Sequence, residues 1–72
     1  MSRVQAVLFK RSEYSSEQAR KWLKKHDFVP IKRVDRTRNL LRYRIVEPRE
    51  FVDFRYHKIK PGIAFIIGFS KK

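Results

Sequence analysis

Residues 15–26 read SSEQARKWLKKH and determine the fold, because they combine a helix start signal with a helical apolar pattern. Ser15 is followed three residues later by Gln18, which is the spacing of a capping box. Apolar and aromatic side chains then recur at the helical spacing i, i+3, i+4 and i+7, a stripe formed by Ala19, Trp22, Leu23 and His26. The stretch therefore predicts an amphipathic helix over Ser16–His26, with Trp22 as the anchor of the core.

On both sides of this helix the pattern changes to the period of two that is typical of strands. The predicted strands are Arg3–Lys10, Ile31–Val34, a longer strand that carries Leu41, Tyr43 and Ile45 on one face, Phe54–Ile59 and Ile63–Phe69. A polar turn is expected at Asp35–Arg38, and a connector at Glu47–Asp53. The order β-α-β-β-β-β predicts an α+β fold, with one amphipathic helix packed on a mostly antiparallel four- to five-stranded sheet.

Glycine and proline mark two further features near the C-terminal end. Pro61-Gly62 suits the central positions of a type II turn, and Gly68 indicates a bulge in the last strand. Residues 1–72 are too few for a second core, so the chain is expected to form a single basic domain. In so short a chain we expect most aromatic side chains to build that core, namely Phe51, Phe54, Tyr56, Phe65 and Phe69.

The charge of the chain is its main functional signal. Nineteen lysines and arginines face seven acidic residues, which gives a formal net charge of +12 over 72 residues. These cations are distributed through segments that fold, and the commonest partner of such a surface is nucleic acid. With so few acids, most of the arginines are expected to have no carboxylate partner.

The strongest candidate surface is the polar face of the predicted longer strand. Arg42 and Arg44 lie two residues apart, so both guanidinium groups project to the same side, about 7 Å apart, a spacing compatible with contacts to neighbouring phosphates. Arg38 extends this row. The other candidates are the preceding Lys32, Arg33 and Arg36, together with a helix surface formed by Arg20, Lys21, Lys24 and Lys25. The alternative is that these side chains only solvate an exposed face, with ion pairs to Asp35 and Glu47.

Catalysis and metal binding have no comparable support. His26 and His57 are far apart in the sequence, and neither belongs to a cluster with ligand spacing. The chain contains no cysteine, which excludes disulfides and thiolate zinc sites, and it contains no glycine-rich phosphate loop. We therefore expect no enzymatic activity, no cofactor and no bound metal.

Three segments of the chain together resemble a known domain. These are SSEQARKWLKKH, KRVDRTRNLLRYRIVEPREF and FRYHKIKPGIAFIIGF. They resemble a small domain found in tailed-phage head-maturation protease polypeptides and as stand-alone proteins of large DNA viruses. The resemblance implies a viral or mobile-element origin and a role near DNA, and it implies no catalytic residues. This chain is more basic than the phage versions, so the inference of DNA binding comes from the chain itself.

The sequence thus predicts a nucleic-acid-binding protein that makes mainly phosphate contacts, with weak sequence preference and with DNA favoured over RNA. The alternative is a structural virion component, or an interaction protein that docks its basic surface on an acidic partner. A second copy of the chain and virion proteins are further candidate partners. No membrane partner is expected, because the longest apolar run, Ile63–Ile67, is too short to span a bilayer. The N-terminus lacks a signal-peptide pattern, so the expected location is the cytoplasm, the nucleus or the virion interior, without secretion.

Overall fold

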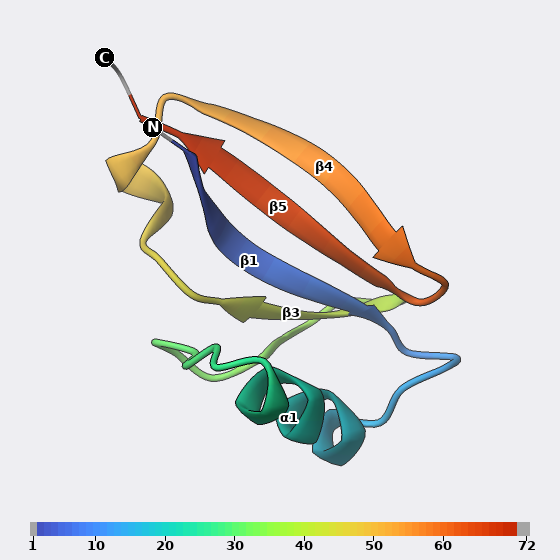
Figure 1. Cartoon of the computed structure of the whole chain (residues 1–72). Helices are drawn as coiled ribbons and strands as arrows, with labels where there is room; N and C mark the ends of the chain where they lie inside the picture. Colours follow the sequence, from blue (N-terminus) through green and yellow to red (C-terminus); the bar gives the residue numbers. More distant parts are fainter. Residues whose placement is uncertain (1, 71–72) are drawn as a thin grey trace.

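The structure is a computed structural model that describes residues 2–70. Its elements follow the predicted order (Figure 1). They are β1 (Ser2–Lys10), α1 (Ser16–Lys25), β2 (Asp35–Arg36), β3 (Leu40–Arg44), a short 3-10 helix η1 (Pro48–Glu50), β4 (Asp53–Lys60) and β5 (Ile63–Phe69). The strands form one antiparallel sheet in the order β2-β3-β1-β5-β4. The predicted α+β class is confirmed.

The helix begins and ends where its local sequence predicts. Ser15 Oγ accepts a hydrogen bond from the Gln18 backbone N–H at 3.2 Å, and Gln18 Oε1 accepts one from the Ser15 N–H at 2.9 Å. This reciprocal pair is the predicted capping box. The helix ends at Lys25, one residue before the predicted end, and His26 is its C-cap residue. Asp27 then turns the chain away with a positive φ of 62°.

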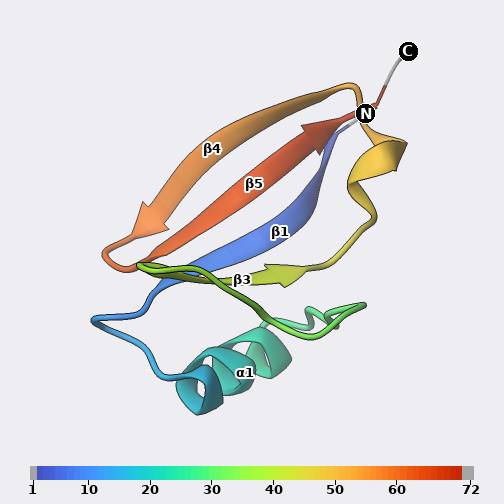
Figure 2. The same ribbon diagram turned by 180° about the vertical axis from the view of Figure 1, so that it is seen from behind.

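The helix covers one face of the sheet, on the side of β1 and β3 (Figures 1 and 2). Ala19 and Leu23 pack against buried side chains of three strands, which are Val7, Phe9, Leu41, Tyr43 and Ile63. Trp22 joins this core from the helix, with its ring centroid 5.7 Å from that of Phe9. Leu41, Tyr43 and Ile45, which the sequence predicts on one face, all belong to this core or pack against it, so that prediction is confirmed.

The second strand differs from the prediction. Ile31–Val34 is not a strand, and the predicted turn residues Asp35 and Arg36 instead form β2, paired with Arg42 and Leu41. A single backbone hydrogen bond, from the Ile31 N–H to the Arg44 carbonyl oxygen, connects residue 31 to β3. The chain reaches β3 in hydrogen-bonding register only at Asp35, and the turn that follows occupies residues 37–39.

The two glycines of the last hairpin are required for different structural reasons. Gly62 has a φ of 85°, the positive value that the second central position of a type II turn requires, as predicted. Gly68 lies at no bulge, which corrects the prediction: the register shifts fall at Val4/Ala6 and Lys58/Lys60. Gly68 is instead covered by the Phe51 ring, and an added Cβ would lie 2.5 Å from that ring.

Within residues 2–70, none of the helical structure is both long and apolar enough to cross a membrane.

Candidate nucleic-acid interface

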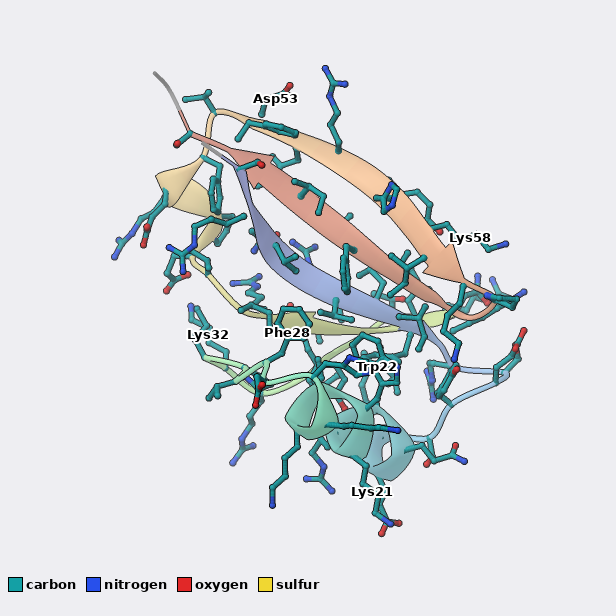
Figure 3. The ribbon with its side chains drawn as sticks, in the orientation of Figure 1. Lys21, Trp22, Phe28, Lys32, Asp53 and Lys58 are labelled. Carbon is teal, nitrogen blue, oxygen red and sulfur yellow. The ribbon has the colours of Figure 1, made fainter. Side chains whose placement is uncertain are left out.

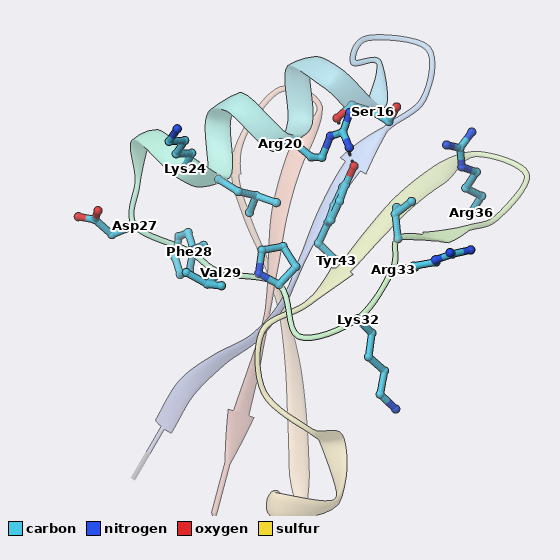
Figure 4. A pocket seen from close by; sticks show the side chains of 13 residues that line it. Ser16, Arg20, Lys24, Asp27, Phe28, Val29, Lys32, Arg33, Arg36 and Tyr43 are labelled. Atoms are coloured by element: carbon cyan, nitrogen blue, oxygen red, sulfur yellow. Dashed lines mark hydrogen bonds between the residues drawn. The ribbon is translucent and has the colours of Figure 1, made fainter.

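A groove of about 920 Å³ separates α1 from the segment of residues 27–36 (Figure 4). Its apolar lining includes Leu23 from the helix, Phe28 and Val34 from the segment, and Tyr43 from β3. The cationic side chains that line it are Arg20, Lys24, Lys32, Arg33 and Arg36. Asp27 is the one acidic residue among the described residues that line the groove. The fold therefore unites half of the predicted binding residues, from two parts of the sequence, around one depression.

Secondary structure places these cations on opposite sides of the groove. Arg20 and Lys24 are four residues apart on α1, so they are neighbours along one face of the helix, about 6 Å apart along its axis. Arg36 lies opposite Leu41 in the β2–β3 pair, so its side chain is on the face of the sheet that the helix covers. Figure 4 shows Arg33 and Arg36 on the side of the groove away from the helix, and Lys32 pointing away from α1.

Few of these charges are neutralised inside the protein. Within residues 2–70, the ion pairs shorter than 4 Å are Lys32 Nζ to Glu47 Oε2 at 3.5 Å and Arg44 Nε to Asp35 Oδ2 at 3.3 Å. Among the described residues, Arg20, Lys24, Arg33 and Arg36 therefore have no carboxylate partner at that distance. The rim of the groove thus carries four exposed cations that no carboxylate of residues 2–70 neutralises at that distance.

Tyr43, at the floor of the groove, connects β3 to α1. Its hydroxyl donates a hydrogen bond to the Ser16 backbone carbonyl oxygen at 3.3 Å, and the residue is buried. Burial raises the pKa of the Tyr43 hydroxyl above its ordinary value, while the positive charges of Arg20 and Arg36 lower it in part. Arg20 of α1 and Arg36 of β2 thus both act electrostatically on the same buried hydroxyl.

Arg42 and Arg44, the leading candidates from the sequence, lie on the other face of the sheet. They pair in register with Leu8 and Ala6 of β1, and they point away from the helix as the alternation predicts. Both residues are half-buried. Arg44 is held by its ion pair with Asp35, so the alternative interpretation of ion-pairing applies to this residue. Arg42 Nε is buried and has no hydrogen-bond partner among the described residues.

The remaining three candidates lie outside both surfaces. Arg38 belongs to the turn between β2 and β3, not to the strand row that the sequence predicts, and it lines a small depression with Lys10 and Arg11. Lys21 and Lys25 are exposed on α1 and do not line the groove. Figure 3 shows Lys21 directed away from the sheet.

Sequence reasoning missed the composition of the face that carries Arg42 and Arg44. Tyr56 and Phe54 were expected in the core, but Tyr56 is 65% exposed and Phe54 is 42% exposed. Both belong to β4, an edge strand without cover from the helix, so the expectation is wrong for these two residues. The strict alternation of Phe54, Tyr56 and Lys58 along one strand was the available signal that they share a face.

In the described part of the chain, no three His, Cys, Asp or Glu residues cluster in a way that could hold a metal ion. Comparisons with models of protein families, with curated proteins and with solved structures found no match to this chain. The resemblance to the phage and viral domain therefore stays a prediction.

Proposed function

We propose that the protein binds nucleic acid, mainly through contacts between its basic side chains and phosphates. The observation that carries the proposal is the groove between α1 and residues 27–36, where five cationic side chains face one acidic side chain. Phosphate contacts of this kind position a protein on a nucleic acid without reading its sequence. The proposal therefore includes weak sequence preference, and DNA is the expected ligand.

The chemistry of the groove suits phosphate. Arg20, Arg33 and Arg36 each present a planar guanidinium that can donate two parallel hydrogen bonds to a phosphate, and Lys24 adds a point charge. The apolar floor of Leu23, Phe28 and Val34 excludes water from one side of such contacts, which strengthens them. Binding of a polyanion also relieves the mutual repulsion of a chain with a net charge of +12.

The experiment is a titration of a fluorescently labelled duplex at several salt concentrations, followed by anisotropy. If about five phosphates are neutralised, the slope of log K against log salt is about −4.5, and affinity falls about 500-fold between about 50 and about 200 mM salt. Polyglutamate of equal charge is the matched control for a partner that offers charge alone.

Two results would contradict the proposal. One is the absence of duplex or single-strand binding at about 50 mM salt, where phosphate contacts are strong. The other is binding to polyglutamate at least as tight as binding to DNA, which would support docking on an acidic protein surface instead.

A further inference from the structure

The sheet face opposite the helix is open in that no helix covers it, and it is mostly apolar. Its central side chains Ala6, Leu8 and Ala64 are buried, and its exposed aromatic side chains are Phe54 and Tyr56 of β4. Its rows can be followed across four strands, because residues opposite one another in antiparallel pairs share a face. One row is formed by Tyr56, Ile66, Ala6 and Arg44, and the next by Lys58, Ala64, Leu8 and Arg42. A hollow of about 350 Å³ in this face is lined both by Phe54 of β4 and by Thr37 beside β2, so the two sides of the sheet curve toward each other.

Phe54 lines this hollow from β4, and Tyr56 lies beside it on the same face of the sheet. Phe54 and Tyr56 are two residues apart on β4, about 7 Å along the strand. The Tyr56 side chain makes no hydrogen bond or ring contact with another described residue, and it is 65% exposed. Arg42 lines the hollow from β3, and Lys58 of β4 lies at the other end of the row that carries Arg42.

The hollow also borders polar atoms that lack partners. Gln5 is fully buried at the β1 bulge, and its Nε2 donates to the Val46 carbonyl oxygen at 2.9 Å. Gln5 Oε1 and Arg42 Nε have no hydrogen-bond partner within residues 2–70, and both residues line the hollow. Both atoms are buried, so these residues mark a polar border of the hollow.

We propose that this open face binds the bases of single-stranded nucleic acid, with Tyr56 and Phe54 as stacking platforms. The inference rests on the proposed function and specifies its substrate class. Every base presents a flat aromatic face together with a hydrogen-bond donor and acceptor, and stacking on aromatic side chains is tolerant of sequence. In a duplex these faces and edges are occupied by neighbouring and paired bases. Arg42, Arg44 and Lys58 at the margins repel a second copy of this cationic chain and attract a phosphate backbone.

The test compares binding of two DNA strands of about 12 nucleotides, a length within the range of known single-strand sites. One strand is oligothymidine, and the other is an abasic strand of the same length and charge. The variants are Tyr56→Ala and Tyr56→Phe. His57→Ala is the matched control, because His57 is the next residue on β4, is also exposed and projects to the other face.

The wild-type protein should bind oligothymidine about 5- to 150-fold more tightly than the abasic strand. Tyr56→Ala should lose a comparable factor for oligothymidine, with no change for the abasic strand and no change in salt slope, because no charge is removed. Tyr56→Phe keeps the ring and should stay within about threefold of the wild type. His57→Ala should leave both affinities unchanged.

Three results would overturn the inference. If the abasic strand binds as tightly as oligothymidine, stacking makes no contribution, while the proposed phosphate binding stands. If His57→Ala has the same effect as Tyr56→Ala, or if Tyr56→Ala weakens both strands equally, the Tyr56 ring has a structural role. If neither strand nor a duplex binds at about 50 mM salt, the proposed function fails and the inference fails with it.

Discussion

Truncation of Trp22 to alanine should destabilise the protein without removing a nucleic-acid contact. The indole lies between α1 and the sheet, and its ring centroid is 5.7 Å from that of Phe9 and 6.2 Å from those of Phe28 and Phe65. It also stacks on His26, at a centroid distance of 4.0 Å. These four ring contacts make Trp22 part of the core packing, so we expect it to act as an anchor and not as a platform for a base.

The expected loss follows from this packing. Truncation of a core tryptophan to alanine costs about 3–5 kcal/mol. Trp22 is half-buried, so a cost near the lower end, about 3 kcal/mol, is the reasonable estimate. A domain of this length has a total stability of about 4–10 kcal/mol. The substitution therefore removes roughly 30% to 75% of the free energy of unfolding.

The assay is urea unfolding followed by far-ultraviolet circular dichroism, because the substitution removes the only tryptophan and with it the fluorescence signal. Lys21→Ala is the matched control, since Lys21 is the adjacent helix residue and is exposed, and it should change stability by less than about 0.5 kcal/mol. A Trp22→Ala variant that keeps its stability within about 1 kcal/mol and loses nucleic-acid affinity would refute the reasoning.

Three further predictions concern packing, protonation and charge. Gly68→Ala places a Cβ 2.5 Å from the Phe51 ring and should lower the free energy of unfolding, measured with urea, by about 1–3 kcal/mol. In a Phe51→Ala background the same change should cost almost nothing, because the ring is gone. An equal cost in that background would contradict the contact. Because burial raises the pKa of Tyr43, the folded protein holds this proton more tightly than the unfolded chain does, so stability declines as pH rises above about 10. Tyr43→Phe should show a shallower decline in unfolding experiments over that range, and an identical decline would exclude this cause. An increase in salt from about 50 to about 500 mM screens the mutual repulsion of the +12 charge. If this screening raises the free energy of unfolding by about 1 kcal/mol, the Tm should rise by about 5 °C. A Tm that is independent of salt would contradict strong self-repulsion.

The helix and the last hairpin could be predicted because their signals are local. The capping box at Ser15 and Gln18 and the Pro61-Gly62 turn each specify a conformation within a few residues, and the structure contains both. The second strand could not be predicted in the same way, because the residues that pair are decided by where β3 passes. Asp35 and Arg36 have turn-like composition, yet they are the residues that reach hydrogen-bonding register with β3.

The candidate site was predictable in its residue types but not in its assembly. Alternation along β3 correctly predicts that Arg42 and Arg44 point away from the helix. Their partial burial was not predictable, since it depends on the ion pair with Asp35 and on the curvature of the sheet. The groove was also not predictable, because the turn at Asp27 decides how closely residues 27–36 approach α1.

The measurement that tests the central claim most directly compares two double variants of α1 in DNA binding. Arg20→Gln with Lys24→Gln removes two charges that line the groove, and Lys21→Gln with Lys25→Gln removes two charges at the same helical spacing that do not. Both variants carry the same net charge, so the long-range field is matched. Any difference between them therefore reports contact with the ligand.

Duplex binding should be measured by anisotropy between about 50 and about 200 mM salt. The Arg20→Gln, Lys24→Gln variant should lower the magnitude of the salt slope by about 1.8. If the electrostatic contribution to binding vanishes near about 1 M salt, this slope change weakens binding by up to about 200-fold at about 50 mM salt. The Lys21→Gln, Lys25→Gln variant should keep the wild-type salt slope and should lose at most a few-fold in affinity. Equal losses for the two pairs, or a larger loss for Lys21 and Lys25, would contradict the assignment of the groove as the phosphate-binding surface.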